Sequence, residues 1–181
     1  MNRGGQNLPG IDFFCFLPHN EREVRTLRII PYADAYRDDM IFMILEAKDA
    51  LGRVPTLNPD LLDIQRNYFD KGDMFWLALS DAGRVIGSVG YSAIPGTDSV
   101  WLHRFYVKAA LKRQGIGTAL YLHAEEHIRK AGKARVRIHL GGPGYEASRL
   151  FYRHFGYEYE QDENYMVKIL RSDRNFPEKD E

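Results

Sequence analysis

A segment with two glycines separates a predicted strand from a long predicted helix, and this junction limits the folds open to the chain. The strand is predicted over residues 99–107 and the helix over about 115–130, and the segment is Arg113-Gln114-Gly115-Ile116-Gly117-Thr118. The first N–H groups of a helix lack intrahelical partners, and the helix dipole favours an anion beside them. Since Lys112 and Arg113 add positive charge, the segment indicates a diphosphate-binding turn.

Two common phosphate-binding motifs do not match this segment. A Walker A loop requires Lys and then Ser or Thr after its second glycine, whereas Gly117 is followed by Thr118 and Ala119. The dinucleotide fingerprint requires a third glycine where this chain has Leu120. A tight junction between strand and helix explains a Gly-x-Gly pair nearly as often, so both interpretations stay open on this motif alone.

Hydrophobic periodicity and turn residues predict seven strands and four helices. The predicted strands span residues 24–30, 74–79, 84–91, 99–107, 134–140, 157–160 and 165–170. The predicted helices span residues 33–48, about 58–69, about 115–130 and 146–154. The order β-α-α-β-β-β-α-β-α-β-β joins hairpin-linked strands to strand–helix–strand units. It predicts an α/β fold, with an α+β mixed sheet and helices on its faces.

The 181 residues suit one domain with an N-terminal extension, placed at residues 1–23. Within the extension, residues 13–17 form an aromatic and apolar cluster that has to pack against something. The plain interpretation is an additional strand on the domain. Since exposed apolar clusters tend to mark interfaces, a homodimer contact is the alternative.

Charge and cysteine content disfavour several classes of protein. Twenty-five basic residues balance twenty-five acidic ones, whereas nucleic-acid binders usually carry excess positive charge, so no nucleic-acid partner is expected. Cys15 is the single cysteine, so neither an internal disulfide nor a metal site is expected. The apolar run at residues 11–17 is too short for a signal peptide or a membrane span. We expect a cytoplasmic protein without a membrane partner.

The two-glycine segment resembles a signature of the Gcn5-related N-acetyltransferase (GNAT) family, Gln/Arg-x-x-Gly-x-Gly/Ala. Residues 112–117 match it except at Lys112, which keeps the charge of arginine but not its planar fork. The preceding run, residues 102–107, looks like the fourth strand of that family.

A second block, residues 145–157, resembles the family pattern Asn-x-x-Ala-x-x-Leu/Phe-Tyr-x-x-x-Gly-Phe. It matches fully or conservatively at Ser148, Phe151, Tyr152, Gly156 and Tyr157. Tyr145 stands where the family has an asparagine that bonds the pantetheine arm. The two blocks occur in the expected order and at the expected distance.

The resemblance covers about residues 24–171, which we take as the acetyltransferase domain, and leaves residues 172–181 as a polar tail. It implies a GNAT-like acyl-CoA N-acyltransferase fold with acetyl-CoA as cofactor. It also implies an EC 2.3.1-type activity toward a primary amine of a small molecule or peptide. The alternative is a non-catalytic module that binds acyl-CoA and regulates a partner.

In such proteins the fourth and fifth strands separate, and the pantetheine arm pairs with the backbone of the fourth. The resemblance therefore implies main-chain contacts at Phe105, Tyr106 and Val107. Around the diphosphate it implies Lys112, Arg113, Gln114, Gly115, Ile116, Gly117 and Thr118. From the second block it implies contacts at Tyr145, Ser148 and Tyr152.

Acyl transfer requires a neutral amine and a proton for the departing thiolate. Tyr152 matches the family tyrosine that protonates the sulfur, and a buried structural tyrosine is the alternative. His103 is the candidate base, because serotonin N-acetyltransferases carry a histidine there; a hydrogen-bonded core histidine is equally open. A backbone carbonyl with water, or His139, could also serve. Strict alternation predicts one shared strand face for Trp101, His103, Phe105 and Val107.

The family fold places the acceptor pocket between the first two helices and the last hairpin, here residues 36–69 and 158–165. Four acidic residues of this hairpin favour a cationic amine, unless they are a solvated turn: Glu158, Glu160, Asp162 and Glu163. Residues 52–56 are a candidate mobile lid.

Residues 123–127 read His-Ala-Glu-Glu-His and match a zinc-protease pattern. Short patterns match often by chance, and the diphosphate-binding turn already accounts for this helix. We therefore expect half-exposed helix histidines there.

Overall fold

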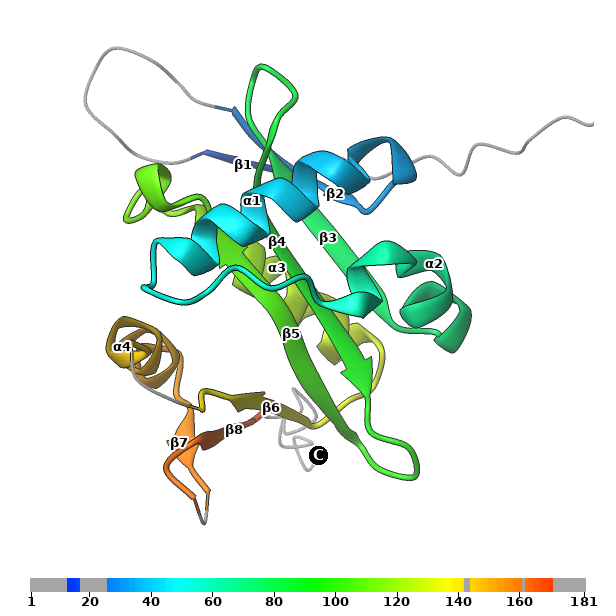
Figure 1. Cartoon of the computed structure of the whole chain (residues 1–181). Helices are drawn as coiled ribbons and strands as arrows, with labels where there is room; N and C mark the ends of the chain where they lie inside the picture. Colours follow the sequence, from blue (N-terminus) through cyan, green and yellow to red (C-terminus); the bar gives the residue numbers. More distant parts are fainter. Residues whose placement is uncertain (1–12, 17–25, 142–143, 161, 171–181) are drawn as a thin grey trace, which may run out of the picture.

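In the part of the chain that the structure describes, eight strands form one sheet in the order β1-β2-β3-β4-β5-β6-β8-β7 (Figure 1). The computed structural model describes residues 13–16, 26–141, 144–160 and 162–170. The strands are β1 (Phe13–Phe16), β2 (Thr26–Pro31), β3 (Met74–Leu79), β4 (Val85–Ala93), β5 (Ser99–Val107), β6 (Arg135–His139), β7 (Glu158–Tyr159) and β8 (Tyr165–Ile169). The α-helices are α1 (Arg37–Asp49), α2 (Ile64–Asn67), α3 (Ile116–Lys130) and α4 (Glu146–His154).

The predicted order of elements is confirmed from β2 to β8. β5 and β6 run parallel, and the other neighbouring pairs of described strands run antiparallel, so the sheet is mixed as predicted. The additional strand predicted in the extension is present as β1, which pairs with β2. The homodimer alternative and the domain boundaries remain predictions, and most of residues 1–23 and 172–181 lie outside the described ranges.

The second predicted helix is interrupted where a continuous one was expected. It consists of a 3-10 turn (Pro59–Leu62), the short α2, and a second 3-10 turn (Phe69–Lys71). Asp63 has a φ of −149°, which is not helical, and its carboxylate caps α2 by accepting the Arg66 N–H at 2.9 Å. A good N-cap residue in mid-segment therefore starts a new helix instead of continuing the old one.

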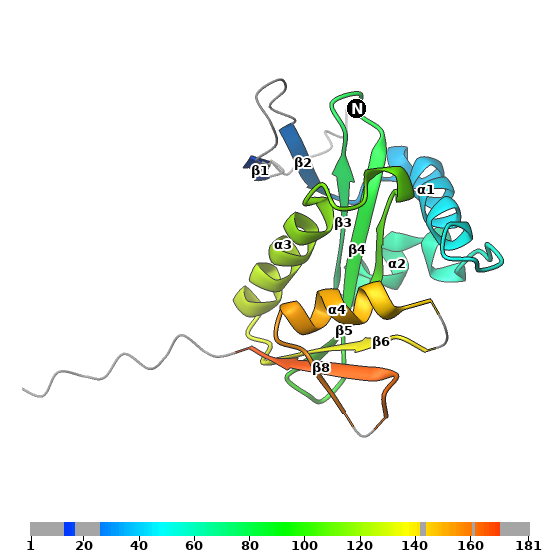
Figure 2. The ribbon, with the colours of Figure 1, turned by 90° about the vertical axis from the view of Figure 1, so that its left-hand side faces the viewer.

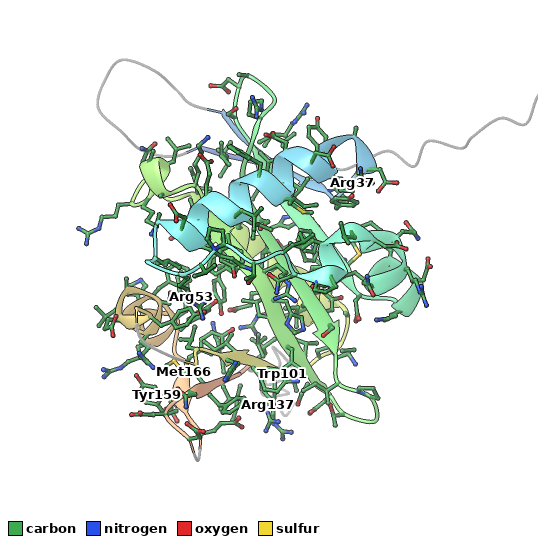
Figure 3. All side chains as sticks on the ribbon, in the orientation of Figure 1. Arg37, Arg53, Trp101, Arg137, Tyr159 and Met166 are labelled. Carbon is green, nitrogen blue, oxygen red and sulfur yellow. The ribbon has the colours of Figure 1, made fainter. Side chains whose placement is uncertain are left out.

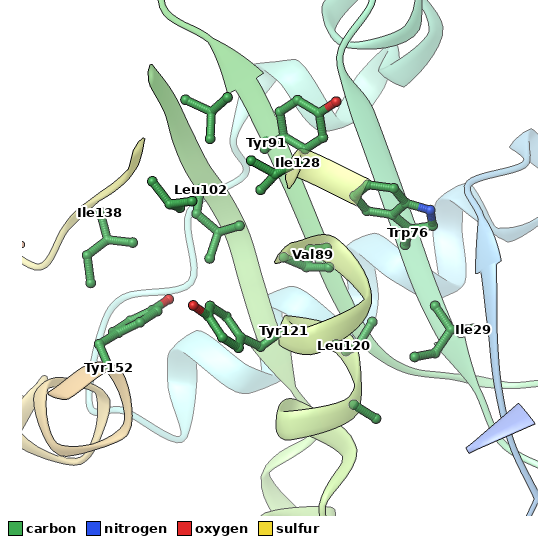
Figure 4. Close-up of a cluster of buried hydrophobic side chains, with 14 of the residues drawn as sticks. Ile29, Trp76, Val89, Tyr91, Leu102, Leu120, Tyr121, Ile128, Ile138 and Tyr152 are labelled. Atoms are coloured by element: carbon green, nitrogen blue, oxygen red, sulfur yellow. The ribbon is translucent and has the colours of Figure 1, made fainter. Parts of the chain in front are cut away.

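Helices cover both faces of the sheet (Figure 2). β3 is buried on both faces, because Phe75 and Leu77 pack in the cluster with α1 and α2, while Trp76 and Ala78 pack in the cluster with α3. This explains why β3 reads as a continuous apolar run. Figure 4 shows the α3 side, which Tyr152 of α4 joins. No helix within the described ranges has the length and apolarity needed to cross a membrane.

A buried polar network ties α3 to β8. The Glu125 carboxylate is only 8% exposed and accepts hydrogen bonds from the Tyr121 hydroxyl, from Lys168 at 2.5 Å and from Arg129 at 2.8 Å. These partners hold the pKa of Glu125 below its usual value although burial acts in the opposite direction. Removal of the Glu125 carboxylate would leave the largely buried Lys168 without its ion-pair partner.

Gly90 of β4 is small because two aromatic rings pack directly over it. A Cβ at this position would lie 2.7 Å from Cδ2 of Phe75 and 3.1 Å from Cε1 of Tyr68. Both rings are fully buried, so neither can move aside without disturbing the cluster under α1 and α2.

We expect Gly90→Ala to lower the free energy of unfolding by about 1–3 kcal/mol through overpacking, as measured by urea denaturation. Gly117→Ala is the matched control, because its Cβ would meet Phe105 and Val107 at ordinary contact distances of 3.5 and 3.6 Å. Alanine also favours a helix over glycine, so the control should not lose stability. Equal stability of Gly90→Ala and the native chain would contradict this packing argument.

Candidate active site

The parallel strands β5 and β6 stay together over only three residue pairs: Ser99–Arg135, Val100–Val136 and Trp101–Arg137. Beyond Trp101, β5 continues along β4 as far as Val107, while β6 continues along β8. Among the described strands, none pairs with residues 102–107 on the edge away from β4; we call this the free edge of β5. α4 lies beside this edge (Figure 2). The Phe105 ring of β5 lies 5.4 Å from the Phe151 ring of α4. Unpaired N–H and C=O groups on such an edge can bind an extended ligand.

A β-bulge lies within the same part of β5. Ser88 of β4 is opposite Tyr106, but Gly90 is opposite His103, so two steps along β4 match three along β5. The residue with the unusual backbone is Arg104, whose φ of +51° is rare for a side chain other than glycine. Its carbonyl accepts a hydrogen bond from the Ser88 hydroxyl at 2.7 Å.

A partly buried ion pair holds the bulge. The Arg104 guanidinium donates to both carboxylate oxygens of Asp60, at 2.9 and 2.6 Å, and the Tyr68 hydroxyl donates to the same carboxylate at 2.7 Å. Burial opposes ionisation of Asp60, but Arg104 and Tyr68 outweigh it and hold the pKa of this carboxyl below its ordinary value. The segment before α2 is thereby fixed to β5.

The bulge overturns the prediction that His103 shares a strand face with Phe105 and Val107. Phe105 and Val107 pack in the cluster under α3. Tyr106 packs in the cluster under α1, and the His103 ring lies 6.5 Å from that of Tyr68, which belongs to the same cluster. One extra residue shifts the two-residue alternation, so side chains after the bulge change faces.

Tyr152 lies on α4 and is 5% exposed. Its ring is 6.2 Å from that of Phe105 and 5.1 Å from that of Tyr157, and Figure 4 shows it beside Tyr121. Burial raises the pKa of the Tyr152 hydroxyl, and the nearby Tyr145 and Tyr106 raise it further. The group therefore keeps its proton at neutral pH and can act as a donor.

His103 is half-buried, and its Nε2 lies 2.6 Å from the Ser92 hydroxyl. Burial, assisted by the Arg104 charge, lowers the pKa of the ring to about 4. The imidazole is thus neutral at pH 7 and free to accept a proton, although it is a weaker base than an unperturbed histidine.

The two-glycine segment forms the predicted turn at the start of α3. Gly115 is the N-cap residue with a φ of +80°, and Arg113 also has a positive φ, +64°. Lys112, Arg113 and Thr118 are exposed, while Ile116 is buried in the core. Gly117 faces Phe105 and Val107, so helix packing and a helix N-terminus open to an anion are combined in one segment.

The model of the acetyltransferase (GNAT) family matches residues 35–157. The chain belongs to the GNAT acetyltransferase family. It is similar to a GNAT-family acetyltransferase from Staphylococcus aureus Mu50, with a TM-score of 0.71 and 19% identity, over 80% of this chain and 99% of that chain. No curated protein matches the sequence.

Two further structures similar to this GNAT protein were solved with ligands. The PaiA N-acetyltransferase from Thermoplasma acidophilum is in complex with coenzyme A, with a TM-score of 0.64 and 18% identity over 80% of this chain and 99% of that one. A GNAT acetyltransferase from Brucella melitensis is in complex with acetyl-CoA, with a TM-score of 0.59 and 20% identity over 81% and 89%.

Tyr145 makes a contact that the sequence did not indicate. Arg53, from the loop after α1, donates a hydrogen bond to the Tyr145 hydroxyl and places its guanidinium carbon 4.7 Å from the centre of that ring. Tyr145 immediately precedes α4, and its spacing from Ser148 and Tyr152 puts the three on one side of the helix. The candidate lid, residues 52–56, therefore contacts the start of α4 through Arg53.

The other candidates from the sequence lie elsewhere. His123 and His127 pack edge-on against Trp76, with ring centres 5.2 and 5.0 Å away. The described residues contain no group of three potential metal ligands. His139 is exposed on β6 and stacks near Tyr165.

A surface depression at the start of α1 includes part of the predicted acceptor region but no residue of the last hairpin. Its lining residues are Ala35, Tyr36, Asp38, Asp39, Phe42, Gly83 and Arg84. None of them belongs to β5, β6 or α4, so this depression is separate from the candidate site.

We expect Asp60→Asn to lower the free energy of unfolding by about 1.5–3 kcal/mol at pH 7, because hydrogen bonds to a charged group are lost. Asp63→Asn is the matched control: its side chain caps α2 at the exposed end of the same segment, and asparagine caps equally well. Similar losses in both variants would contradict a special role for the Asp60–Arg104 pair.

The stability difference between the native chain and Asp60→Asn should depend on pH. The folded pKa of Asp60 is lowered, so its contribution is complete above the unfolded value of about 3.9 and is lost as the pH falls through the folded value. Denaturation series from about pH 6 to about pH 2 should show the two stabilities converging. A constant difference across that range would argue against ionisation of Asp60 as the cause.

Proposed function

We propose that this GNAT protein transfers the acetyl group of acetyl-CoA directly to a primary amine of a small molecule or peptide. The observation that carries the proposal is the position of Tyr152: a buried, protonated hydroxyl beside the free edge of β5. The family assignment and similar proteins solved with coenzyme A or acetyl-CoA support it.

The residues present fit coenzyme A. The start of α3 offers N–H groups without intrahelical partners, and the exposed Lys112 and Arg113 lie beside them, so residues 112–118 would hold the diphosphate. The free edge of β5 at Phe105, Tyr106 and Val107 would pair with the pantetheine amides. Tyr145 and Ser148 would line the arm from α4.

When bound, acetyl-CoA supplies the thioester carbon for attack by the amine nitrogen and the sulfur that leaves. Tyr152 donates its hydroxyl proton to the departing thiolate. The resulting tyrosinate is returned to the phenol by a proton from solvent. Since burial raises the pKa of Tyr152, the proton is present when the C–S bond breaks.

His103 is the proposed acceptor of the amine proton. Its neutral ring lies on the α1–α2 face of β5, the side from which the acceptor enters in this proposal. The Ser92 hydroxyl at 2.6 Å fixes the ring orientation. A pKa of about 4 limits its strength, so the step is assisted by removal of the proton to water.

We expect Tyr152→Phe to reduce acetyl-CoA-dependent thiol release with a panel of amines by about 10²-fold or more, the contribution typical of a general acid. Coenzyme A affinity, measured by calorimetry, should stay within about threefold, because only the hydroxyl is removed. Phe151→Leu, beside it on α4, is the control for altered packing. Tight coenzyme A binding without thiol release from any amine would instead favour the regulatory, non-catalytic module.

A further inference from the structure

Two cations near the candidate site, Lys48 at the end of α1 and Arg53 in the loop that follows, have no carboxylate hydrogen-bond partner among the described residues. Lys48 donates to the Thr56 carbonyl and to Oδ1 of Asn58, both at 2.5 Å. Arg53 donates to the Tyr145 hydroxyl. Each of these acceptors is a neutral oxygen, so neither positive charge is neutralised by its partners.

The neighbouring cations on the same side of the sheet are neutralised. Arg104 is paired with Asp60 at 2.6 Å, and Arg137 of β6 is paired with Glu160 at 2.7 Å. Four cationic side chains against two carboxylates leave two positive charges, those of Lys48 and Arg53. Figure 3 shows Arg53 between α1 and α4, with Arg137 and Trp101 further down the same view.

The two unpaired cations have different roles. Lys48 is 7% exposed, and its two hydrogen bonds close the loop onto the end of α1, so it mainly shapes the loop. Arg53 is half-buried and reaches across to the start of α4, where it stacks on Tyr145. Burial lowers the pKa of Lys48, and the charges of Arg104 and Arg53 lower it further, which outweighs the opposite effect of Asp60.

Arg53 comes from the α1 side of the sheet and contacts Tyr145, which packs against the cluster on the α3 side. Its loop follows α1, which packs on the Tyr106 side of the sheet, whereas α3 packs on the Phe105 and Val107 side. Arg53 belongs to a different segment from the diphosphate turn at residues 112–118, and the test below separates an anion of the acceptor from an anion of the cofactor.

One of the four acidic side chains of the last hairpin is neutralised by a cation. Glu160 is committed to Arg137, and Asp162 accepts hydrogen bonds from Asn164 at 2.8 Å. Glu158 and Glu163 are exposed to solvent. The attraction of a cationic amine to this hairpin, expected from the sequence, thus loses one of its four candidates, Glu160.

We infer that the acceptor amine carries an anionic group, a carboxylate or a phosphate, and that Arg53 binds this group while the amine nitrogen reaches the free edge of β5. The inference rests on the proposed acetyl transfer and adds the class of acceptor. A guanidinium suits it because its planar donors bind carboxylate and phosphate in pairs. Tyr145 holds the guanidinium in place.

The test compares acceptors that differ only in charge. Thiol release from acetyl-CoA is measured with ω-amino carboxylates, ω-aminoalkyl phosphates, and the uncharged ω-amino amides of the same chain lengths. At least one anionic acceptor should exceed its amide in kcat/KM by about tenfold or more. The better of the two anionic series identifies the group that Arg53 binds.

Variants at Arg53 then assign the preference. Arg53→Met should bring the ratio of anionic to amide acceptors close to one and leave coenzyme A affinity unchanged, whereas Arg53→Lys should retain part of the ratio. Arg37→Met, on the exposed start of α1, is the matched control and should keep the full ratio. Loss of coenzyme A affinity in Arg53→Met would assign the guanidinium to the cofactor and overturn the inference.

The remaining outcomes separate this inference from the proposed function. Equal transfer to anionic and amide acceptors, or an Arg53-dependent preference for succinyl-CoA over acetyl-CoA, would overturn the inference while acetyl transfer stands. Thiol release from no amine would contradict the proposed function. In that case, calorimetry measures how the N-acetylated carboxylates, phosphates and amides bind to coenzyme A-loaded protein. Binding of the anionic compounds that depends on Arg53 would support the anion site. Absence of such binding would overturn the inference.

Discussion

The separation of β5 from β6 is the constraint on which the rest of this molecule depends. The two strands share only three residue pairs, after which each follows its other neighbour. A parallel sheet that simply continued would leave no backbone group of β5 for a ligand. Because the strands part, α4 can pack its aromatic side chains against Phe105 and bring Tyr152 to the free edge. The same edge leads directly into the turn at the start of α3.

Local strain is concentrated at that edge and is compensated by specific contacts. Arg104 holds a left-handed backbone conformation within a strand, and its side chain is fixed by a carboxylate from a segment 44 residues earlier. Backbone conformations of this kind persist only where the surroundings determine them, and they occur frequently at functional sites. The ion pair thus links the bulge to the segment that precedes α2. The result places His103 and Tyr106 on one side of β5 and Phe105 on the other.

Much of the fold could be predicted because apolar residues recur with the period of a strand in some segments and with the period of a helix in others. Strand β3 and helix α3 follow from apolar spacing, and the turn at Gly115 and Gly117 follows from the lack of side chains at a helix start. The bulge at Arg104 could not be predicted, because nothing in a strand sequence marks an arginine for a positive φ, and one inserted residue reverses every later face assignment. The contact between Arg53 and Tyr145 joins residues 92 positions apart, which local spacing cannot reveal. The pairing of Asp60 with Arg104 likewise joins residues 44 positions apart.

Hydrogen exchange of the backbone amides, with and without coenzyme A, tests the central claim most directly. If the free edge of β5 and the start of α3 together hold the ligand, slowed exchange should concentrate in residues 102–107 and 113–118. Amide exchange in β2, which lies three strands away from β5 in the sheet, should be unchanged. Protection confined to the surface around α1, or no change at β5 while coenzyme A is bound, would contradict the account.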